Sequence, residues 1–461
     1  MRTLLLFIGV CASAADWPTY RGDDARSGVS TEQLKLPLKN SWVHQPLHAP
    51  RPAWRGPAKQ DLYNKAYFFN HLGKKILYKL KNRQLFDHAF QVVADAQSLY
   101  FGSSADDQVH CLDLNTGKER WSYFTEGPVR LAPTLSGGHL FVGSDDGHAY
   151  CLSTGGKLIW RQRLAPSDYR IAGNNRIISA WPLRTGILVR DGIAYAGAGM
   201  FPSEGVHVVA FNADDGKEKW RTTQTDLPAQ GYMLLSKKSV YIPAGRNNPV
   251  VFDQASGKIV HKVSASADAF TLIKWNEKSL PNPRQSGRII GLVEGEKQDS
   301  YATFTGNRMI VDGGRSYLQA HRELSVLDRA RYLELERDLK VMAGKRAKLG
   351  KQLAQLRKQK SPEVSKVQEQ LIASGRALDE IQAKIKGCVI WRTPCDQPHA
   401  LILVGDTLFA GGNNEIVAYS TVDGRKSWSA SVKGVALGIA VAHGRLLVST
   451  DQGAIHCFIS K

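Results

Sequence analysis

The chain has 461 residues, of which 43% are hydrophobic, and it contains 42 glycines and 19 prolines. That length can bury a large core, and the five cysteines beyond residue 15, an odd number, exclude a small scaffold held together by disulfides. The net charge of +19 includes no polybasic block outside residues 328–387, which indicates a solvated basic surface and argues against a nucleic-acid partner.

The N-terminus predicts a signal peptide over residues 1–15. Met1-Arg2 precedes the apolar run from Leu4 to Val10, and Ala12-Ser13-Ala14 supplies a cleavage site of small residues. This run is too short to span a bilayer, and no other stretch is apolar for about 18 residues, so no transmembrane segment is expected. Cys11 would permit a lipid anchor, but Val10 stands where a small residue is wanted. We therefore expect an exported protein, periplasmic or extracellular.

Two features follow before the first full repeat. A strand is expected near residues 40–45, carrying Trp42, and it would complete the last unit of the fold, whose own chain stops at "AIHCFISK". Joining the two ends of the chain in one sheet would leave no free outer edge there. The next segment, 46–82, is predicted to be a long loop insertion.

The ten residues "LDLNTGKERW" (112–121) introduce a phrase that recurs through the chain. Each copy leaves a strand, passes through a polar turn containing glycine, and in most cases reaches a tryptophan. Glycine suits a turn position with positive φ. Copies start at residues 111, 151, 210, 251 and 418, and an alternating apolar strand such as "SLYFGS" or "HLFVGS" precedes each one. Units recurring about every 40 residues predict four-stranded propeller blades.

The phrase and its tryptophan resemble the repeat of pyrroloquinoline quinone (PQQ)-type propellers, and "DWPTYRGDDARSG" (16–28) is similar to the N-terminal segment of those proteins. The resemblance implies an all-β, quinoprotein-like β-propeller over residues 16–461, in which tryptophan docks each blade on its neighbour. The expected docking residues are Trp42, Trp121, Trp160, Trp220, Trp391 and Trp428. Counting the closing strands predicts eight blades, with Val260 at the fourth position. Seven is the alternative, because residues 261–304 lack the turn phrase.

Candidate ligand-binding residues come from the connections that share one face of a propeller. Arg130, Arg184 and Gln230 occupy the same register in three successive blades, so they predict a polar lining near the central channel. Longer connections on that face add further candidates, namely Asp168, Arg176, Trp181, Glu204, Arg246 and Trp54. Loops carry function more often than the strands they join. The alternative is that these side chains only line a wet channel.

Residues 329–387 are predicted to form an antiparallel coiled-coil hairpin inserted in one blade. Apolar residues follow a 3-4 spacing on both sides of Ser361-Pro362-Glu363, which is a good helix start. The insertion replaces a turn between a third and a fourth strand, so it belongs to the face opposite the candidate site. Two interpretations stay open: the hairpin is an insertion whose polar faces are only solvated, or it is a docking arm for a protein partner.

Motifs for catalysis are weak in this sequence. We find no H-E-x-x-H, Cys/His ligand cluster, G-x-S-x-G elbow or Walker loop, so no catalytic residue, metal site or cofactor is predicted. The interpretation we favour is an exported, non-catalytic binding or scaffold protein of the cell envelope, similar to the group that contains the outer-membrane assembly propeller lipoprotein. Its oligomeric state is left open.

Two alternatives remain. The first is a PQQ- and calcium-dependent oxidoreductase. The resemblance would then have Arg130, Arg184 and Arg246 hold the cofactor carboxylates, with Trp181 or Trp54 stacked on the ring. The second is a carbohydrate-binding propeller that uses the aromatic residues of the funnel.

Overall fold

The computed structural model describes residues 15–53, 67–69, 75–77, 86–173, 175–244, 247–262, 271–274, 277–281, 288–293, 300–306, 308–320 and 322–461. The predicted signal peptide therefore lies outside the described residues except for Ala15. Most of the predicted 46–82 loop insertion, with Trp54, also lies outside them, and so does Arg246.

Most of the described chain folds into antiparallel sheets of four consecutive strands. Six such sheets are described, and the first two are β5 (Val92–Ala94), β6 (Ser98–Gly102), β7 (Gln108–Asp113) and β8 (Glu119–Phe124), followed by β9 (Thr134–Ser136), β10 (His139–Gly143), β11 (His148–Ser153) and β12 (Leu158–Arg163). The third and fourth are β15 (Leu188–Arg190), β16 (Ile193–Ala198), β17 (Val206–Asn212) and β18 (Glu218–Gln224), followed by β19 (Leu234–Leu235), β20 (Ser239–Ala244), β21 (Asn247–Asp253) and β22 (Ile259–Lys262). The last two are β23 (Thr271–Lys274), β24 (Glu277–Pro281), β25 (Arg288–Val293) and β26 (Ser300–Thr305), followed by β27 (Arg308–Asp312), β28 (Arg315–Gln319), β29 (Glu323–Asp328) and β30 (Val389–Pro394).

A larger sheet contains both ends of the chain. Its eight strands, in spatial order, are β1 (Val29–Ser30), β31 (Ala400–Val404), β32 (Thr407–Gly411), β33 (Asn413–Ser420), β34 (Lys426–Ala442), β35 (Arg445–Thr450), β36 (Ile455–Ser460) and β2 (Leu38–His44). The long β34 pairs with β33 through its first half and with β35 through its second, so it joins two four-stranded units. β2 covers the outer edge of β36, from Leu38 opposite Ser460 to His44 opposite Ile455.

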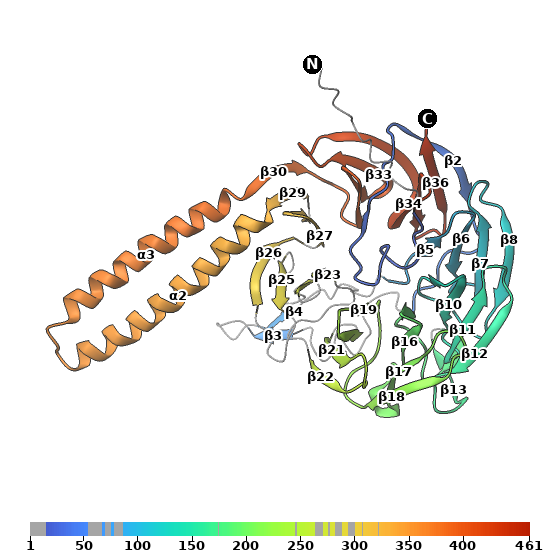
Figure 1. Ribbon diagram of the computed structural model, residues 1–461, viewed down its shortest axis with the longest axis horizontal. Coiled ribbons are helices and arrows are strands. Elements are labelled where there is room, and N and C mark those ends of the chain that lie inside the picture. Colours follow the sequence, from blue (N-terminus) through green and yellow to red (C-terminus); the bar gives the residue numbers. More distant parts are fainter. Residues whose placement is uncertain are drawn as a thin grey trace, which may run out of the picture.

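The sheets are arranged around a common centre, which is the architecture of a β-propeller (Figure 1). Two short hairpins accompany them within the described ranges: β3 (Tyr67–Phe69) with β4 (Lys75–Leu77), and β13 (Arg170–Gly173) with β14 (Arg176–Ser179). A single 3-10 turn, η1 (Pro202–Glu204), follows β16.

Tryptophan joins neighbouring four-stranded units in a repeated way. The indole Nε1 of Trp42, Trp121, Trp160, Trp220, Trp391 and Trp428 donates to a backbone carbonyl of the next unit, at N–O distances of 2.9–3.1 Å. For each of these tryptophans except Trp428, the ring lies against the turn glycine of that unit: a Cβ on Gly117 would lie 2.5 Å from Trp42. Gly117 also has a φ of +69°. The turn phrase therefore needs glycine both for its backbone conformation and for the space that the indole fills.

The docking position lacks tryptophan in two consecutive sheets. Strand pairing places His261 opposite Val251, where Trp220 stands opposite Ala210, so the fourth docking position is His261 and the expectation of Val260 was wrong by one residue. In the other copies of the turn phrase the tryptophan comes four residues after the turn glycine, and the same spacing from Gly257 gives His261. In the next sheet the position falls to Ala302, opposite Gly291.

The N-terminal segment 15–34 runs across one end of the central channel. Its backbone exchanges hydrogen bonds with first strands or the turns after them in several units, including Trp17 N to Ala94 O (2.8 Å), Leu135 N to Pro18 O (2.7 Å) and Leu403 N to Gly28 O (2.8 Å). Arg26 is 1% exposed and donates from Nε to the carbonyl of Met233 (2.8 Å). This segment therefore closes the end of the channel that carries the turns between first and second strands.

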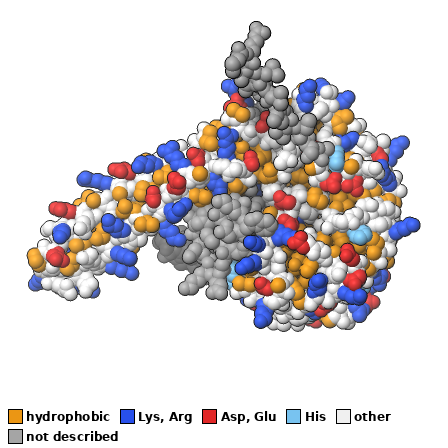
Figure 2. Space-filling model, viewed as in Figure 1, with side chains coloured by type: hydrophobic (Ala, Val, Ile, Leu, Met, Phe, Trp, Pro, Cys, Tyr) orange, Lys and Arg blue, Asp and Glu red, His pale blue; other side chains and the backbone are white. Residues whose placement is uncertain are grey.

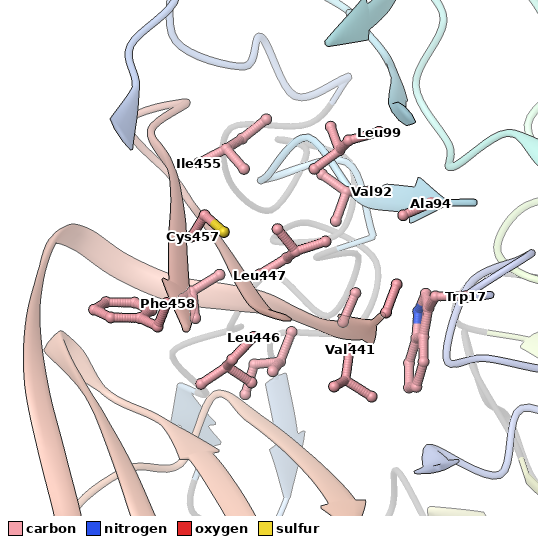
Figure 3. Close-up of a cluster of buried hydrophobic side chains, with 14 of the residues drawn as sticks. Trp17, Val92, Ala94, Leu99, Val441, Leu446, Leu447, Ile455, Cys457 and Phe458 are labelled. Atoms are coloured by element: carbon pink, nitrogen blue, oxygen red, sulfur yellow. The ribbon is translucent and has the colours of Figure 1, made fainter. Parts of the chain in front are cut away.

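The largest buried cluster ties this segment to the last strands of the chain. Figure 3 shows Trp17 near Val441 and Leu446, with Leu447 and Cys457 toward the first described sheet. The five described cysteines, Cys111, Cys151, Cys388, Cys395 and Cys457, are all buried free thiols. Burial raises the pKa of the Cys111 thiol to about 11, so the thiol stays protonated near neutral pH and packs as a small apolar group.

Two long helices project from the sheets between β29 and β30 (Figure 1). They are α2 (Arg329–Lys358) and α3 (Val364–Lys386). Asp328 caps α2, because its Oδ1 accepts from the backbone N–H of Arg331 at 3.1 Å. Leu349, Leu353 and Val367 bury the seam between the helices. No helix in the described ranges is long and apolar enough to cross a membrane.

Candidate functional site

The end of the propeller opposite the N-terminal segment carries the candidate residues. We call it the loop face, and define it as residues 125–133, 144–147, 164–187, 199–205 and 225–231. These connections enter the first strands β9, β15 and β19, or join the second to the third strand in the sheets β9–β12 and β15–β18. The site is built from these connections while the sheets hold them in place.

Arg130 and Arg184 meet at one buried carboxylate on this face. Arg184 holds Asp145 with two bonds, Nε to Oδ1 at 2.9 Å and Nη2 to Oδ2 at 2.8 Å. Arg130 donates from Nε to the same Oδ2 at 2.5 Å. Its Nη1 contacts Asp87 Oδ2 at 3.3 Å and the Arg51 carbonyl at 2.7 Å. The shared register predicted from sequence thus brings the two arginines together, around Asp145.

Charge pairing keeps this cluster ionised although it is buried. Asp145 is fully buried, and Arg130 and Arg184 are 5% and 2% exposed. Burial alone would raise the pKa of Asp145, but the two guanidinium groups bring that pKa below its ordinary value. Asp145 and Asp87 likewise raise the pKa of Arg130 against the effect of burial.

The two arginines do not fit a role as clamps for the carboxylates of PQQ. Their charged N–H groups already donate to Asp145, to Asp87 and to a backbone carbonyl, and Arg184 Nη1 lies 2.9 Å from Met200 Sδ. A further anion at this place would have to displace a buried internal carboxylate. Among the described residues, no group of three or more His, Cys, Asp or Glu side chains is arranged to hold a metal ion.

Gln230, Trp181 and Glu204 are also placed on the loop face, but in separate surroundings. Gln230 is 5% exposed, and its Oε1 is buried without a hydrogen-bond partner. Trp181 is 7% exposed, and its Nε1 donates to the Glu204 carbonyl at 2.7 Å, so the connection after β16 covers the indole. The side chain of Trp181 is therefore packed rather than presented to a ligand.

Asp168 and Arg176 belong to the hairpin β13–β14, which ion pairs hold against the first two sheets. Arg176 Nη1 contacts Asp107 Oδ2 at 2.8 Å. On the other strand, Arg170 contacts Glu126 at 2.6 Å and the exposed Asp168 at 3.1 Å. Hydrogen bonds from Arg170 and Arg161 lower the pKa of Glu126 below its ordinary value.

Three large side chains close in sequence to these ion-paired residues are exposed. Phe124, Tyr169 and Ile177 are 70%, 59% and 69% exposed. Phe124 lies two residues from Glu126, and Tyr169 and Ile177 directly adjoin the arginines that the ion pairs hold. We call these three residues the hairpin patch. Apolar side chains gathered on an exposed surface mark interaction sites.

A basic groove of about 560 Å³ lies beside the hairpin, between the sheets β9–β12 and β15–β18. It is lined by His148, Arg161, Gln162, Arg163, Ala165, Pro166, His207, Arg221 and Thr223. The lining contains three arginines and no carboxylate, but Arg161 contacts Glu126 and Arg221 contacts Glu218, each at 2.6 Å. Arg163 forms no ion pair among the described residues, so it is the lining arginine that can attract an anionic group. His207 is 7% exposed, with Nδ1 2.9 Å from Thr223 Oγ1 and Nε2 buried without a partner. Burial, and then Arg221, lower the pKa of His207, which favours the neutral imidazole.

Sequence reasoning missed the carboxylates and the exposed apolar residues. Asp145 and Asp146 look like ordinary turn residues in "GSDDGH", and nothing local indicates that Asp145 is shared by two arginines. Phe124 and Ile177 sit in strands where alternation permits either burial or exposure. The basic groove carried a signal in Arg161, Arg163 and Arg221, which lie on the two equivalent outer strands β12 and β18.

Comparison with known proteins places this architecture. The sequence matches the family model described as outer membrane protein assembly factor BamB, over residues 79–174, 146–308 and 373–459. These ranges include well over half of the chain. The chain belongs to the BamB family. No curated protein sequence matches this BamB-family chain at a significant level.

Solved structures agree with this BamB-family assignment at the level of fold. Quinohemoprotein alcohol dehydrogenase from Comamonas testosteroni is 13% identical with a TM-score of 0.58, and the match covers 98% of this chain and 82% of that one. The computationally designed Ika8 protein is 9% identical with a TM-score of 0.54, and the match covers 81% of this chain and 96% of that one. BamB from Moraxella catarrhalis is 11% identical, and the match covers 92% of this chain and 100% of that one. Its TM-score of 0.42 is too low to support a conclusion about the present fold. Identities this low support the PQQ-repeat propeller fold alone.

Proposed function

We propose that this BamB-family protein is an exported, non-catalytic scaffold whose loop face binds an acidic surface of another envelope protein. The observation that carries the proposal is the hairpin patch beside the basic groove. Three large apolar side chains are exposed within two residues of the ion pairs that hold the hairpin, and a groove lined by arginine and histidine without a carboxylate lies beside it. Together they offer apolar anchors and an anion-attracting rim, which is a common composition of protein interfaces.

Energetics support the patch as an anchor. Burying one large apolar side chain contributes about 1.5–3 kcal/mol. Tyr169 and Ile177 adjoin arginines that ion pairs hold, and Phe124 lies on β8, so the three residues require little ordering when a partner binds. A carboxylate of the partner in the groove would gain charge-assisted hydrogen bonds from Arg163, which has no ion pair in the described part of the chain.

The finer architecture belongs to the same proposal. We take each four-stranded unit as a blade and the eight-stranded sheet as two blades, which gives eight, with β2 as the outer strand of the last one. We take α2 and α3 as the predicted antiparallel coiled-coil hairpin. Export rests on residues 1–15 and on the family name, which describes an outer membrane protein assembly factor.

Site-specific photo-crosslinking in living cells tests the protein-binding function. A crosslinking amino acid at position 177 should give one dominant protein adduct, whereas the same group at Ile259, which is 44% exposed on the outer strand β22, should not. Reversing the groove charge with Arg163→Glu should abolish the adduct at 177 while thermal unfolding stays close to wild type, because Arg163 is exposed and makes no ion pair within the ranges that the structure describes. Equal adducts from 177 and 259, or an adduct that survives charge reversal, would refute the proposed site.

A separate titration tests whether the protein is non-catalytic. Calorimetry of the mature protein with PQQ, with and without calcium, should give no heat of specific binding. Tight, calcium-dependent binding at one site would overturn the scaffold proposal in favour of a quinoprotein oxidoreductase. Because this measurement does not involve the hairpin patch, the two tests fail independently.

A further inference from the structure

The arm formed by α2 and α3 has its charge concentrated on one helix and toward its outer half. Residues 339–362, from the middle of α2 to the turn, contain eight Lys and Arg and no Asp or Glu. The acidic residues of α2, Glu334, Glu336 and Asp338, all lie near the propeller body. The companion helix α3 carries four basic and three acidic residues, so it is nearly neutral. Figure 2 shows Lys and Arg side chains along the projecting arm.

Four lysines of α2 share the side of the helix that faces away from α3. Lys340, Lys348, Lys351 and Lys358 are exposed, and with 3.6 residues per turn they fall on one side. The opposite side holds Leu349 and Leu353, which are buried in the seam. Exposed small residues, Gly344, Ala347 and Ala354, separate the lysines. No Asp or Glu lies between Lys340 and Lys358 on this outer lysine face, and Val341, which is 71% exposed, lies at its border.

The arm carries this face beyond the electrostatic influence of the body. At 1.5 Å per residue, the 30 residues of α2 extend about 45 Å. Screening at physiological salt reduces charge interactions over about 8 Å. The outer half of α2 therefore acts as an independent basic surface.

We propose that the outer lysine face of α2 binds the anionic headgroup surface of a lipid bilayer. Charge complementarity carries this inference: a flat row of flexible lysines suits a diffuse negative surface, and a lysine near such a surface raises binding about fivefold. Insertion into the acyl region is not expected, because the face has no apolar stripe. The inference also uses the export proposed above, since an exported chain meets phospholipid rather than nucleic acid. It assigns the arm to the membrane and leaves the loop face for the protein partner.

Co-sedimentation with vesicles tests this assignment on the full mature chain. We expect binding to vesicles of phosphatidylcholine with phosphatidylglycerol, little binding to pure phosphatidylcholine, and loss of binding as salt is raised. The variant Lys340→Gln, Lys348→Gln, Lys351→Gln and Lys358→Gln should lower the partition onto anionic vesicles by at least about tenfold.

The matched control removes the same number of charges from the other helix. Lys366→Gln, Arg376→Gln, Lys384→Gln and Lys386→Gln should lower the partition by less than about threefold, because these charges are balanced along α3. Far-ultraviolet circular dichroism and thermal unfolding verify that both variants keep the fold. Equal losses in the two variants, equal binding to neutral vesicles, or binding to duplex DNA without binding to anionic vesicles would overturn the proposal. Photo-crosslinking at the hairpin patch is unaffected by any of these outcomes, so the two proposals can fail separately.

Discussion

Asp145 is the residue on which two buried cations of the loop face depend. It accepts two bonds from Arg184 and one from Arg130, and no water reaches it. Removing one partner of a buried ion pair leaves the other charge uncompensated. Arg130 still has Asp87, but Arg184 has only a thioether besides Asp145 for its guanidinium in the described contacts.

Asp145→Asn should therefore lower the free energy of unfolding by about 3–5 kcal/mol. Chemical denaturation followed by tryptophan fluorescence measures the change. The control is Asp168→Asn, since Asp168 has a side chain 58% exposed and pairs with Arg170 at the surface, where a loss below about 1 kcal/mol is expected. Equal losses for the two variants would show that the buried cluster contributes nothing beyond an ordinary surface pair.

The lowered pKa of His207 predicts that the protein loses stability as the pH falls. Its pKa is lower in the folded protein than in the unfolded chain, so the unfolded chain binds more protons below about pH 6.5. The stability that comes from keeping this imidazole neutral is complete above the ordinary pKa and is lost as the pH falls. His207→Gln should therefore reduce the loss of stability between about pH 7 and about pH 5. Denaturant unfolding at both pH values checks this, with His139→Gln on β10 as the control; an unchanged slope in His207→Gln contradicts it.

At the scale of the element, the turn phrase couples a backbone conformation to a neighbouring indole. Gly257 has a φ of +69°, and a Cβ there would lie 2.3 Å from the Trp220 ring. Gly192 has a similar φ of +71°, and no atom lies within 4 Å of its Cβ position. Substituting each of these two glycines by alanine therefore separates the cost of the positive φ from the cost of a Cβ pressed against the indole ring.

Gly257→Ala should destabilise the protein more than Gly192→Ala. The strained φ costs about 1–2 kcal/mol in both variants, and overpacking against Trp220 adds about 1–3 kcal/mol in the first alone. Thermal and denaturant unfolding of the two variants provide the comparison. If both lose the same free energy, the indole moves aside at no cost and the docking role of the turn glycine is wrong.

Elements were predictable from sequence where their signal is local. The turn glycine, the polar residues before it and the tryptophan four residues later lie in one short window, so five copies of the phrase could be aligned without a structure. The strand expected near 40–45 lies at Leu38–His44, and the helices lie within the predicted 329–387. The docking position at His261 was misplaced because its tryptophan is absent and the alignment had no anchor there.

The site was less predictable because its contacts are not local. Register placed Arg130 and Arg184 on one face, but it could not place Asp145 between them, since the three residues come from separate connections. Arg176 likewise reaches Asp107, 69 residues earlier, which no spacing rule indicates. Exposure of Phe124 and Ile177 depends on where the hairpin packs, so composition alone gave no indication of the hairpin patch.

At the scale of the whole molecule, β2 is the strand that covers the edge of β36. Trp42 is 9% exposed and reaches from β2 to the carbonyl of Leu114 in the next unit. Without β2, the edge of β36 would present unpaired backbone groups, and the first described sheet would lose a docking indole.

A chain that begins at residue 46 should fail to form a stable monomer. It also lacks the segment 15–34 that closes one end of the channel. We expect aggregation or dimerisation through β36, visible by size-exclusion chromatography with light scattering, whereas a chain that begins at residue 16 should be monodisperse. A monodisperse, cooperatively unfolding monomer from residue 46 would show that β2 is dispensable.

The pairing of β2 with β36 can form only late in the synthesis of the chain. The two strands are separated by about 410 residues, so β2 emerges from the ribosome long before its partner exists. At synthesis rates of about 5–20 residues per second, β2 waits for roughly 20–80 s with its backbone groups unpaired. Closing so long a loop is also slow, because a large entropy loss precedes the contacts that compensate it. The pairing that completes this sheet is therefore expected only after Ile455–Ser460 has been synthesised.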